Sequence, residues 1–333
     1  MDGEVKRLVH FCRFRQEKRK MKIDAIIPVH RPGAEFMKLL EKLKEQNLPL
    51  QKILIMHTQA ENEEELKLPD WQELEVIRLK PEEFDHGGTR DRAARLSDAD
   101  YLLFMTQDAL PADSQLTEKL YAPFADKRVK VAYARQLPRE DCRELERYTR
   151  AFNYPDESRI KTAEDLEKLG VKTFFCSNVC AMYERRTYLE QGGFPKRTIF
   201  NEDMIFAGGL IQKGYAVAYA ADAKVIHSHN YSGVQQCHRN FDLAVSQAEH
   251  PEIFQAAASE REGIRLVKNT AAHCVRTGKP WLVFSLVYYS ACKYLGYRLG
   301  KSWRRLPEKW VMRFTMNKAY WNKAYGKQRG EKI

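Results

Sequence analysis

The sequence predicts an α/β fold in which a doubly wound, mostly parallel sheet is flanked by helices and followed by a helical C-terminal region. Short apolar runs of strand length alternate with segments of helical periodicity through the first 134 residues. The chain has 333 residues, of which 44% are hydrophobic, so it can bury a large core. From residue 241 onward the pattern is mainly helical.

Four apolar runs predict the first strands of the sheet, and a fifth comes directly before the polar stretch at 135–170. A helix is expected after the first strand, where Phe36, Leu39, Leu40 and Leu43 recur at helical spacing, and another at 89–96. The predicted strands are residues 23–29, 52–56, 74–79, 101–105 and 129–134. Since ligands of such sheets gather at the carboxyl ends of strands, the residues that follow these runs are candidate site residues.

The second half of the chain is patterned differently. Polarity rises through 135–170, which indicates an insertion or a hinge with a helix at 140–152. A helix is predicted from Asn201-Glu202-Asp203 to Lys213, where Gly214 ends it. Residues 215–229 are predicted to form paired strands.

Charge and cysteine usage limit the classes of protein. The 56 Lys and Arg against 45 Asp and Glu give a net charge of +11, which favours phosphates, nucleic acid or an anionic membrane as partners. No recognised nucleic-acid motif accompanies this charge, so nucleic acid is disfavoured. Apart from Cys176 and Cys180, which are four positions apart, the seven cysteines lack paired short spacings, which indicates a reducing, cytoplasmic location. Residues 1–20 are basic without a secretory apolar stretch and are expected to be a disordered tail.

The C-terminal region contains an apolar run at 281–292. Lys293 and Arg298 interrupt the run well short of the roughly 20 residues that span a bilayer. Residues 297–325 then mix aromatic with basic side chains. Two interpretations stay open: the segment lies at an anionic membrane interface, or it forms a helical hairpin packed on the main domain.

Two acidic positions are candidates for chemistry. Asp108 follows an apolar strand, so its carboxylate is expected at the strand's carboxyl end, where it would bind a divalent cation; the alternative is a turn-forming residue before Pro111. Glu202 and Asp203 open a helix, so they are either helix caps or include a general base held ionised by the helix dipole.

His227 and His229 are two residues apart at a predicted strand end. In a regular strand they would share one face and approach one ligand. A zinc site that joins them to Cys176 and Cys180 is disfavoured, because the spacing matches no recognised zinc motif.

The turn at 84–91 places two glycines and an arginine between a predicted strand and helix. Gly87 and Gly88 would let the backbone approach a ligand closely. The turn is not a P-loop, since it lacks the Gly-Lys-Ser/Thr ending.

Taken in order, five motifs resemble those of the family 2 glycosyltransferases of GT-A fold, and among these the bacterial rhamnosyltransferases that use dTDP-L-rhamnose. The resemblance covers residues 22 to about 321. The motifs are Ala25-Ile26-Ile27-Pro28-Val29, Phe84-Asp85-His86-Gly87-Gly88-Thr89-Arg90, Phe104-Met105-Thr106-Gln107-Asp108-Ala109, Gly192-Gly193-Phe194-Pro195 with Asn201-Glu202-Asp203, and His227-Ser228-His229-Asn230-Tyr231-Ser232.

The resemblance implies a role for each matching residue. Asp108 would be the surviving carboxylate of the Asp-X-Asp metal motif, with Thr106 in place of the first Asp, and would hold Mg²⁺ or Mn²⁺ together with His227 or His229. Asp203 would be the catalytic base, with Glu202 beside it in the acceptor pocket. The implied donor-binding residues are Pro28, His30, Arg31, His57, His86, Gly87, Gly88, Arg90, Gln107 and Asp108.

The implied activity is inverting transfer of L-rhamnose from dTDP-L-rhamnose to a hydroxyl of a cell-surface polysaccharide or lipid-linked glycan precursor. It would take place in the cytoplasm, with the inner face of the plasma membrane as a candidate location. The implied organisation is a glycosyltransferase domain at 21–240, divided into a nucleotide-sugar half (21–134) and an acceptor half (135–240), and a helical region at 241–333. One alternative is the same fold with a UDP-hexose or galactofuranose donor. The other is a non-catalytic membrane scaffold, for which Thr106 and Met56 are the motivating departures.

Overall fold

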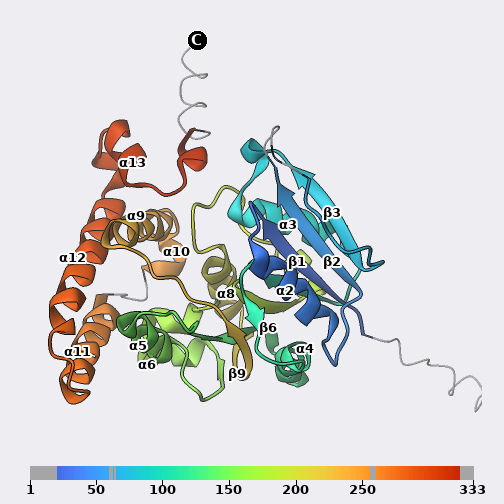
Figure 1. Cartoon of the computed structure of the whole chain (residues 1–333), viewed down its shortest axis with the longest axis horizontal. Helices are drawn as coiled ribbons and strands as arrows, with labels where there is room; N and C mark the ends of the chain where they lie inside the picture. Colours follow the sequence, from blue (N-terminus) through green and yellow to red (C-terminus); the bar gives the residue numbers. More distant parts are fainter. Residues whose placement is uncertain (1–20, 60–62, 64, 256–259, 323–333) are drawn as a thin grey trace, which may run out of the picture.

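A computed structural model describes residues 21–59, 63, 65–255 and 260–322, so the predicted tail at 1–20 lies outside the described residues. Within these ranges nine strands form one sheet in the order β3-β2-β1-β4-β8-β6-β9-β5, and β7 pairs with β9 (Figure 1). The strands are β1 (Ile23–Val29), β2 (Lys52–Thr58), β3 (Leu74–Leu79), β4 (Tyr101–Met105), β5 (Leu110–Pro111), β6 (Val129–Leu137), β7 (Arg159–Lys161), β8 (Cys180–Glu184) and β9 (Ala216–Ile226).

Helices connect and cover these strands. The α-helices are α2 (Ala34–Lys44), α3 (His86–Leu96), α4 (Leu116–Tyr121), α5 (Glu144–Asn153), α6 (Leu166–Leu169), α7 (Arg185–Glu190), α8 (Glu202–Gln212), α9 (Gly233–Glu249), α10 (Pro251–Phe254), α11 (Glu260–Arg276), α12 (Leu282–Lys301) and α13 (Glu308–Phe314). Short 3₁₀ turns are η1 (Pro81–Glu83), η2 (Ala122–Ala125), η3 (Ala163–Asp165), η4 (Gly170–Phe174) and η5 (Trp303–Arg305).

The predicted α/β architecture is confirmed. Strands β3, β2, β1 and β4 run parallel, and β6 pairs with β9 in parallel, but β8 lies antiparallel between β4 and β6. Successive strand residues point to opposite faces, so Ile26 and Phe104 belong to one core and Ile27 and Met105 to the other. Helices α3 and α8 contribute to the first core, and α2 and α4 to the second.

Two predicted elements differ from the structure. Residues 215–229 do not form paired strands: β9 is a single strand of 11 residues, and a register shift against Ala134 and Arg135 accommodates its extra residues without a turn. Helix α3 begins at His86 and not at Thr89, because the Asp85 carboxylate accepts a hydrogen bond from the Gly88 amide and caps the helix. The expected turn at 84–91 is therefore mostly the first turns of a helix.

The C-terminal helices pack on one another and on the end of the domain. Helix α12 lies along α9 at the left edge of Figure 1, where a Cβ at Gly296 would be 2.0 Å from the carbonyl oxygen of Cys237. Phe241, Val311 and Trp321 form a third core there. The inner side of this C-terminal region therefore fits the interpretation as helices packed on the main domain. Among the described helices, none combines the length and apolar content needed to cross a bilayer.

Candidate functional site

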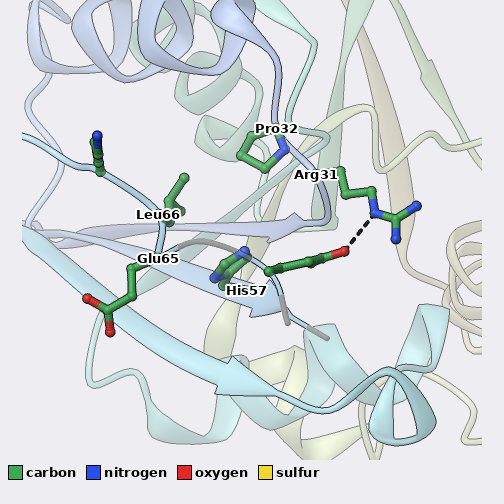
Figure 2. A pocket seen from close by; sticks show the side chains of 7 residues that line it. Arg31, Pro32, His57, Glu65 and Leu66 are labelled. Atoms are coloured by element: carbon green, nitrogen blue, oxygen red, sulfur yellow. Dashed lines mark hydrogen bonds and ion pairs between the residues drawn. The ribbon is translucent and has the colours of Figure 1, made fainter. Parts of the chain in front are cut away.

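A pocket lies at the carboxyl ends of β1 and β2. It has a volume of about 420 Å³, and Figure 2 shows Arg31 and His57 on its walls. Arg31 has a left-handed backbone (φ 45°), and its Nε donates to Glu63 Oε1 at 2.7 Å. The lining residues are Arg31, Pro32, His57, Glu63, Glu65, Leu66 and Lys67. Two residues predicted for donor binding, Arg31 and His57, therefore line one pocket.

His30 connects this pocket to the loop after β4. Its backbone amide donates to Gln107 Oε1 at 2.8 Å, and Gln107 Nε2 donates back to the His30 carbonyl at 3.0 Å. The His30 ring Nδ1 lies 3.2 Å from the carbonyl oxygen of Thr58, at the end of β2. The ends of three neighbouring strands are thus joined, and Asp108 follows Gln107 directly.

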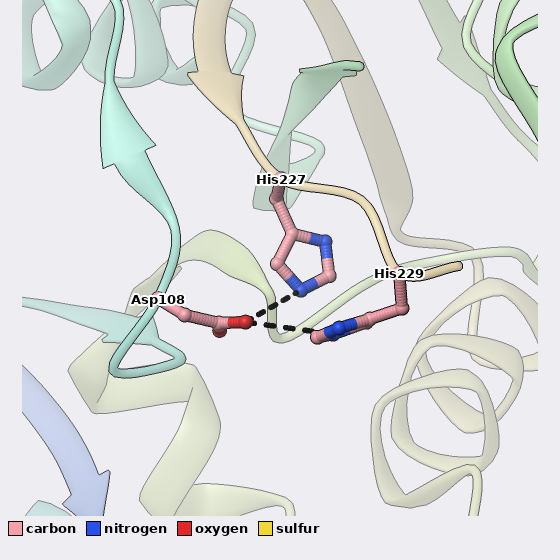
Figure 3. A group of neighbouring side chains, drawn as sticks. All are labelled: Asp108, His227 and His229. Carbon is pink, nitrogen blue, oxygen red and sulfur yellow. Dashed lines mark ion pairs between the residues drawn. The ribbon is translucent and has the colours of Figure 1, made fainter. Parts of the chain in front are cut away.

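Asp108 meets the two predicted histidines beyond the carboxyl end of β4 (Figure 3). Its Oδ2 lies 3.6 Å from His227 Nε2 and 3.4 Å from His229 Nε2. Because β9 ends at Ile226, the shared face of a regular strand does not explain this convergence; the chain after the strand turns both rings inward. Among the described residues, this is the one group of acidic, His or Cys side chains with metal-binding geometry.

A contact at the other ring nitrogen of His227, Nδ1, fixes the orientation of the ring. Its Nδ1 lies 3.1 Å from Gln136 Oε1, and that amide oxygen only accepts, so Nδ1 carries the proton and Nε2 faces Asp108. Burial, with the charges of nearby groups that include Arg139 and Arg150, lowers the pKa of His227 well below its usual value. Burial also lowers the pKa of His229, although Asp108 opposes this. Both rings are therefore neutral near pH 7, the form that binds a metal ion.

Arginines that the sequence analysis did not single out surround this group. Arg139 Nη2 donates to the Asp108 carbonyl at 2.8 Å and lies 4.0 Å from its carboxylate. Arg150 on α5 donates to Gln136, and Arg239 on α9 lies with its guanidinium carbon 4.6 Å from the ring centre of Phe200. Arg150 and Arg239 lie on helices far from Asp108 in the sequence, so their approach depends on tertiary packing, which the sequence pattern does not encode.

The zinc alternative finds no geometric support. Cys176 is buried with its Sγ 3.5 Å from Tyr183 Oη, and Cys180 lies in the core of the sheet. Neither belongs to the group formed by Asp108, His227 and His229. The six cysteines within the described ranges are all free thiols.

Asp203 and Glu202 begin α8 and have different surroundings. Asp203 Oδ2 accepts a hydrogen bond from the Asn178 backbone amide at 2.9 Å, and its Oδ1 accepts one from Met204 at 2.8 Å. Glu202 Oε1 accepts from the side-chain amide of Asn178 at 3.1 Å. Glu202 therefore combines a hydrogen bond to a backbone amide at the start of α8 with a partner outside the helix. Asn178, which holds both carboxylates, was not predicted, because nothing in its local sequence distinguishes it.

Arg90 completes this second cluster. Its guanidinium Nη1 lies 3.3 Å from Glu202 Oε1 and donates to the His86 carbonyl at 2.8 Å, and both charged side chains are more than nine-tenths buried. A Cβ at Gly87 would be 2.5 Å from the Pro195 carbonyl, so the close backbone approach at this glycine is to the loop before α8. His86, Gly87 and Arg90 therefore lie beside the start of α8, where the predicted base Asp203 is, and Gly88 lies beside the helix cap Asp85.

The two adjacent carboxyls titrate differently. Burial would raise the pKa of Glu202, but the Arg90 charge, the His86 ring and the Asn178 amide outweigh burial and hold that pKa below its usual value. Burial, together with the neighbouring charge of Glu202, raises the pKa of Asp203 to about 7. At neutral pH Glu202 is ionised, while Asp203 is poised to exchange a proton.

These two clusters are joined through the strand order. Strand β8 pairs with β4, and the Thr106 amide donates to the Val179 carbonyl at 3.2 Å. Asn178, which binds Asp203, is therefore next to a residue that pairs with the Asp108 loop. The Asp203 carboxyl, whose pKa is raised, and the Asp108 group, which could bind a metal ion, are therefore linked through residues 178 and 179.

A mostly parallel sheet with polar side chains gathered at the carboxyl ends of its strands is the arrangement of α/β proteins that bind ligands at that edge. The sequence profile of Glycosyl transferase family 2 matches residues 24–191, half of the chain. The chain belongs to this family, and the predicted membership is confirmed.

Individual relatives within the family show which members this chain is similar to. The chain is 39% identical over 306 residues to the O-antigen chain rhamnosyltransferase RfbN of Salmonella typhimurium. The aligned region covers 91% of this chain and 96% of RfbN. This chain is also 41% identical over 251 residues to the O-antigen chain rhamnosyltransferase WbaN of Salmonella anatum. That aligned region covers 74% of this chain and 79% of WbaN. The mannosyltransferase PcManGT from Pyrobaculum calidifontis, solved with GDP-Man and Mn²⁺, matches with a TM-score of 0.57 at 13% identity over 86% of this chain and 88% of that chain. The predicted GT-A fold is confirmed.

Proposed function

We propose that this chain is an inverting rhamnosyltransferase that moves L-rhamnose from dTDP-L-rhamnose to a hydroxyl of an O-antigen type polysaccharide. The similarity to RfbN and WbaN supports the sugar and the class of acceptor. The observation that carries the chemistry is the pairing of two clusters across Asn178 and Val179: Asp108 with two histidines on one side, and Asp203 on the other.

The leaving-group side fits a divalent cation. One carboxylate oxygen and two imidazole nitrogens lie within 4.8 Å of one another, a mixed oxygen and nitrogen set that suits Mn²⁺ and also admits Mg²⁺. When bound, such an ion would neutralise charge on the departing diphosphate. Arg139 adds a fixed positive charge beside Asp108, where the phosphates would lie.

Asp203 is the proposed base. Its carboxylate accepts two backbone hydrogen bonds that fix its position, and the raised pKa lets it take the proton of an acceptor hydroxyl near neutral pH. With Asp203 as the one base and the departing diphosphate held at the Asp108 group, the proposed reaction is a single displacement, which inverts the anomeric carbon. Glu202 is not a second base, because it is buried and paired with Arg90.

The donor nucleoside would occupy the pocket between Arg31 and His57. Its volume of about 420 Å³ at the ends of β1 and β2 suits a base and ribose, and the His30 and Gln107 pair links it to Asp108. Pro28 is the penultimate residue of β1 and is not among the residues that line this pocket. The remaining predicted donor residues, His86, Gly87, Gly88 and Arg90, lie by the base, and a contact there would be with the sugar and not with the nucleotide.

A donor screen tests the proposal. Purified full-length chain is melted with dTDP-L-rhamnose, dTDP-glucose, UDP-galactose and UDP-galactofuranose, each with and without Mn²⁺. A ligand at 100 times its Kd stabilises by about 2.7 kcal/mol, which for a chain of this size raises Tm by roughly 4 °C. We expect this rise for dTDP-L-rhamnose with Mn²⁺, and dTDP release on addition of an O-antigen acceptor.

The control variant is Asp203→Asn, which keeps the size of the side chain. It should bind the donor with the same rise in Tm and release no dTDP. Stabilisation by a UDP-sugar alone would refute the donor assignment, and substantial turnover by Asp203→Asn would refute the base. Donor-induced stabilisation with no transfer to any glycan would favour the non-catalytic scaffold instead.

A further inference from the structure

The outer side of α12 exposes a stripe of large apolar side chains. Phe284 is 81% exposed and Leu295 53%, whereas the opposite side of the helix is closed against α9 at Gly296 and Gly300. The exposed positions recur at spacings of three, four and seven residues, so they lie on one side of the helix. The stripe comprises Trp281, Phe284, Val287, Tyr288, Tyr294 and Leu295. We refer to these six residues as the α12 stripe.

Basic side chains adjoin the stripe. Residues 277–322 contain nine Lys or Arg and a single acidic residue, Glu308, so this segment carries a net +8 of the chain's +11. Arg298 and Lys301 continue the exposed side of α12 by one further turn, and Arg304 and Arg305 are exposed just after it. Apolar and cationic surface are therefore contiguous on the edge of the molecule formed by α12 (Figure 1).

We propose that the α12 stripe and the basic side chains beside it dock on the surface of an anionic lipid bilayer. A helix with one apolar side and flanking Lys and Arg, and with Trp and Tyr among its apolar residues, lies in the plane of a bilayer interface. The stripe from Phe284 to Leu295 extends about 16 Å along the helix, so it makes a lateral contact with the interface.

A second copy of this chain is a poorer occupant. Docking two such surfaces would bring two segments of charge +8 together, and their repulsion would oppose the apolar contact. Anionic headgroups instead supply the complementary charge, worth a roughly fivefold gain in binding for each basic residue near the surface. Charge complementarity therefore selects the bilayer.

Two hydrogen bonds link the docking helix α12 to the candidate site. Tyr289 Oη on α12 lies 3.1 Å from Arg143 Nη1, and the Arg143 amide donates to Asn230 Oδ1 at 2.9 Å. Asn230 follows His229 directly, so one side chain links the docking helix to the loop of the candidate site. The membrane proposal concerns binding alone, and its test requires no turnover.

Sedimentation with vesicles tests the proposal. Full-length protein is mixed with phosphatidylcholine vesicles that contain 30% phosphatidylglycerol or none, at low and high salt. We expect binding to the anionic vesicles that weakens as salt rises. Phe284→Asp with Leu295→Asp should weaken it by about tenfold or more. Arg298→Glu with Lys301→Glu should weaken it by about twentyfold or more.

Matched controls alter similar residues on other elements. Leu96→Asp with Ile160→Asp changes two exposed apolar residues on α3 and β7, and should bind vesicles as the unaltered protein does. Failure of the unaltered protein to bind anionic vesicles, or equal loss in the control and in the α12 variant, overturns the proposal. Sedimentation velocity without lipid gives a further outcome: a dimer that Phe284→Asp with Leu295→Asp converts to monomer would assign the stripe to self-association instead.

Discussion

Replacing Glu202 with glutamine separates the two roles assigned to the paired carboxyls. Glutamine has the same shape and can still accept a hydrogen bond from Asn178, but it removes the negative charge opposite Arg90. At 3.3 Å and an effective dielectric constant of about 20, Coulomb's law gives about 5 kcal/mol for this pair as an upper limit. Removing one partner of a buried ion pair usually lowers the free energy of unfolding by about 3–5 kcal/mol. Because glutamine keeps one hydrogen bond, we expect the free energy of unfolding to fall by about 3 kcal/mol. This lowers Tm by about 4 °C for a chain of this length.

The same change should move the pH profile. As the proposed base, Asp203 must be ionised to accept a proton, so we expect turnover of the unaltered protein to fall as pH drops below about 7, where the raised pKa of Asp203 lies. Part of that rise comes from the Glu202 charge, so Glu202→Gln lowers the pKa of Asp203 and shifts the acidic limb down by about one pH unit. The assay is release of dTDP from dTDP-L-rhamnose in the presence of acceptor between pH 5 and 9.

Glu184→Gln is the matched control. It breaks a partly buried pair with Lys130 at 2.8 Å, at the far end of β8 from Asn178. We expect it to cost about 1 kcal/mol and leave the acidic limb in place. An acidic limb of Glu202→Gln that coincides with that of the unaltered protein would refute the electrostatic coupling, and an unchanged Tm would refute a stabilising role for the ion pair.

The remaining predictions concern the metal group and the packing of α12. Asp108→Asn should abolish the Tm rise given by Mn²⁺ without lowering Tm in its absence, as measured by melting with Mn²⁺ and with EDTA; a retained Mn²⁺ response would exclude Asp108 as a ligand. Gly296→Ala should lower the free energy of unfolding in urea by about 1–3 kcal/mol, because the added Cβ would lie 2.0 Å from the Cys237 carbonyl oxygen. Gly263→Ala, on α11 with open space around it, should instead gain up to about 1 kcal/mol, and equal effects would contradict the close packing.

The sequence predicted most of the sheet because its signals are local. Each buried strand of a parallel sheet is a continuous apolar run, and helices between them show their own periodicity. Asp108 was predictable for the same reason, since the end of β4 is visible in the sequence. The single long β9 was not, because the Ala and Tyr residues of 216–221 carry no signal that separates one strand from two.

The site was harder to predict where residues act across long sequence distances. Arg90 and Glu202 are 112 positions apart, and their pairing follows from the packing of α3 beside α8, which no periodic pattern specifies. The glycines before Arg90 suggested a ligand-binding turn, yet Gly87 is required where α3 approaches Pro195. His227 and His229 were predicted to converge from strand geometry, and they converge beyond the strand's end.

A three-residue segment, Ser177 to Val179, links the two clusters of the candidate site. Ser177 Oγ accepts from Gln136, which orients His227; Asn178 binds both Glu202 and Asp203; and the Val179 carbonyl accepts from Thr106, two residues before Asp108. This is possible only because β8 runs antiparallel between β4 and β6, so that the segment entering β8 lies at the carboxyl ends of both neighbours. A parallel strand in that place would have put its amino end at the opposite edge of the sheet. The one reversal of direction in the centre of the sheet is therefore what links the proposed base to the proposed metal site.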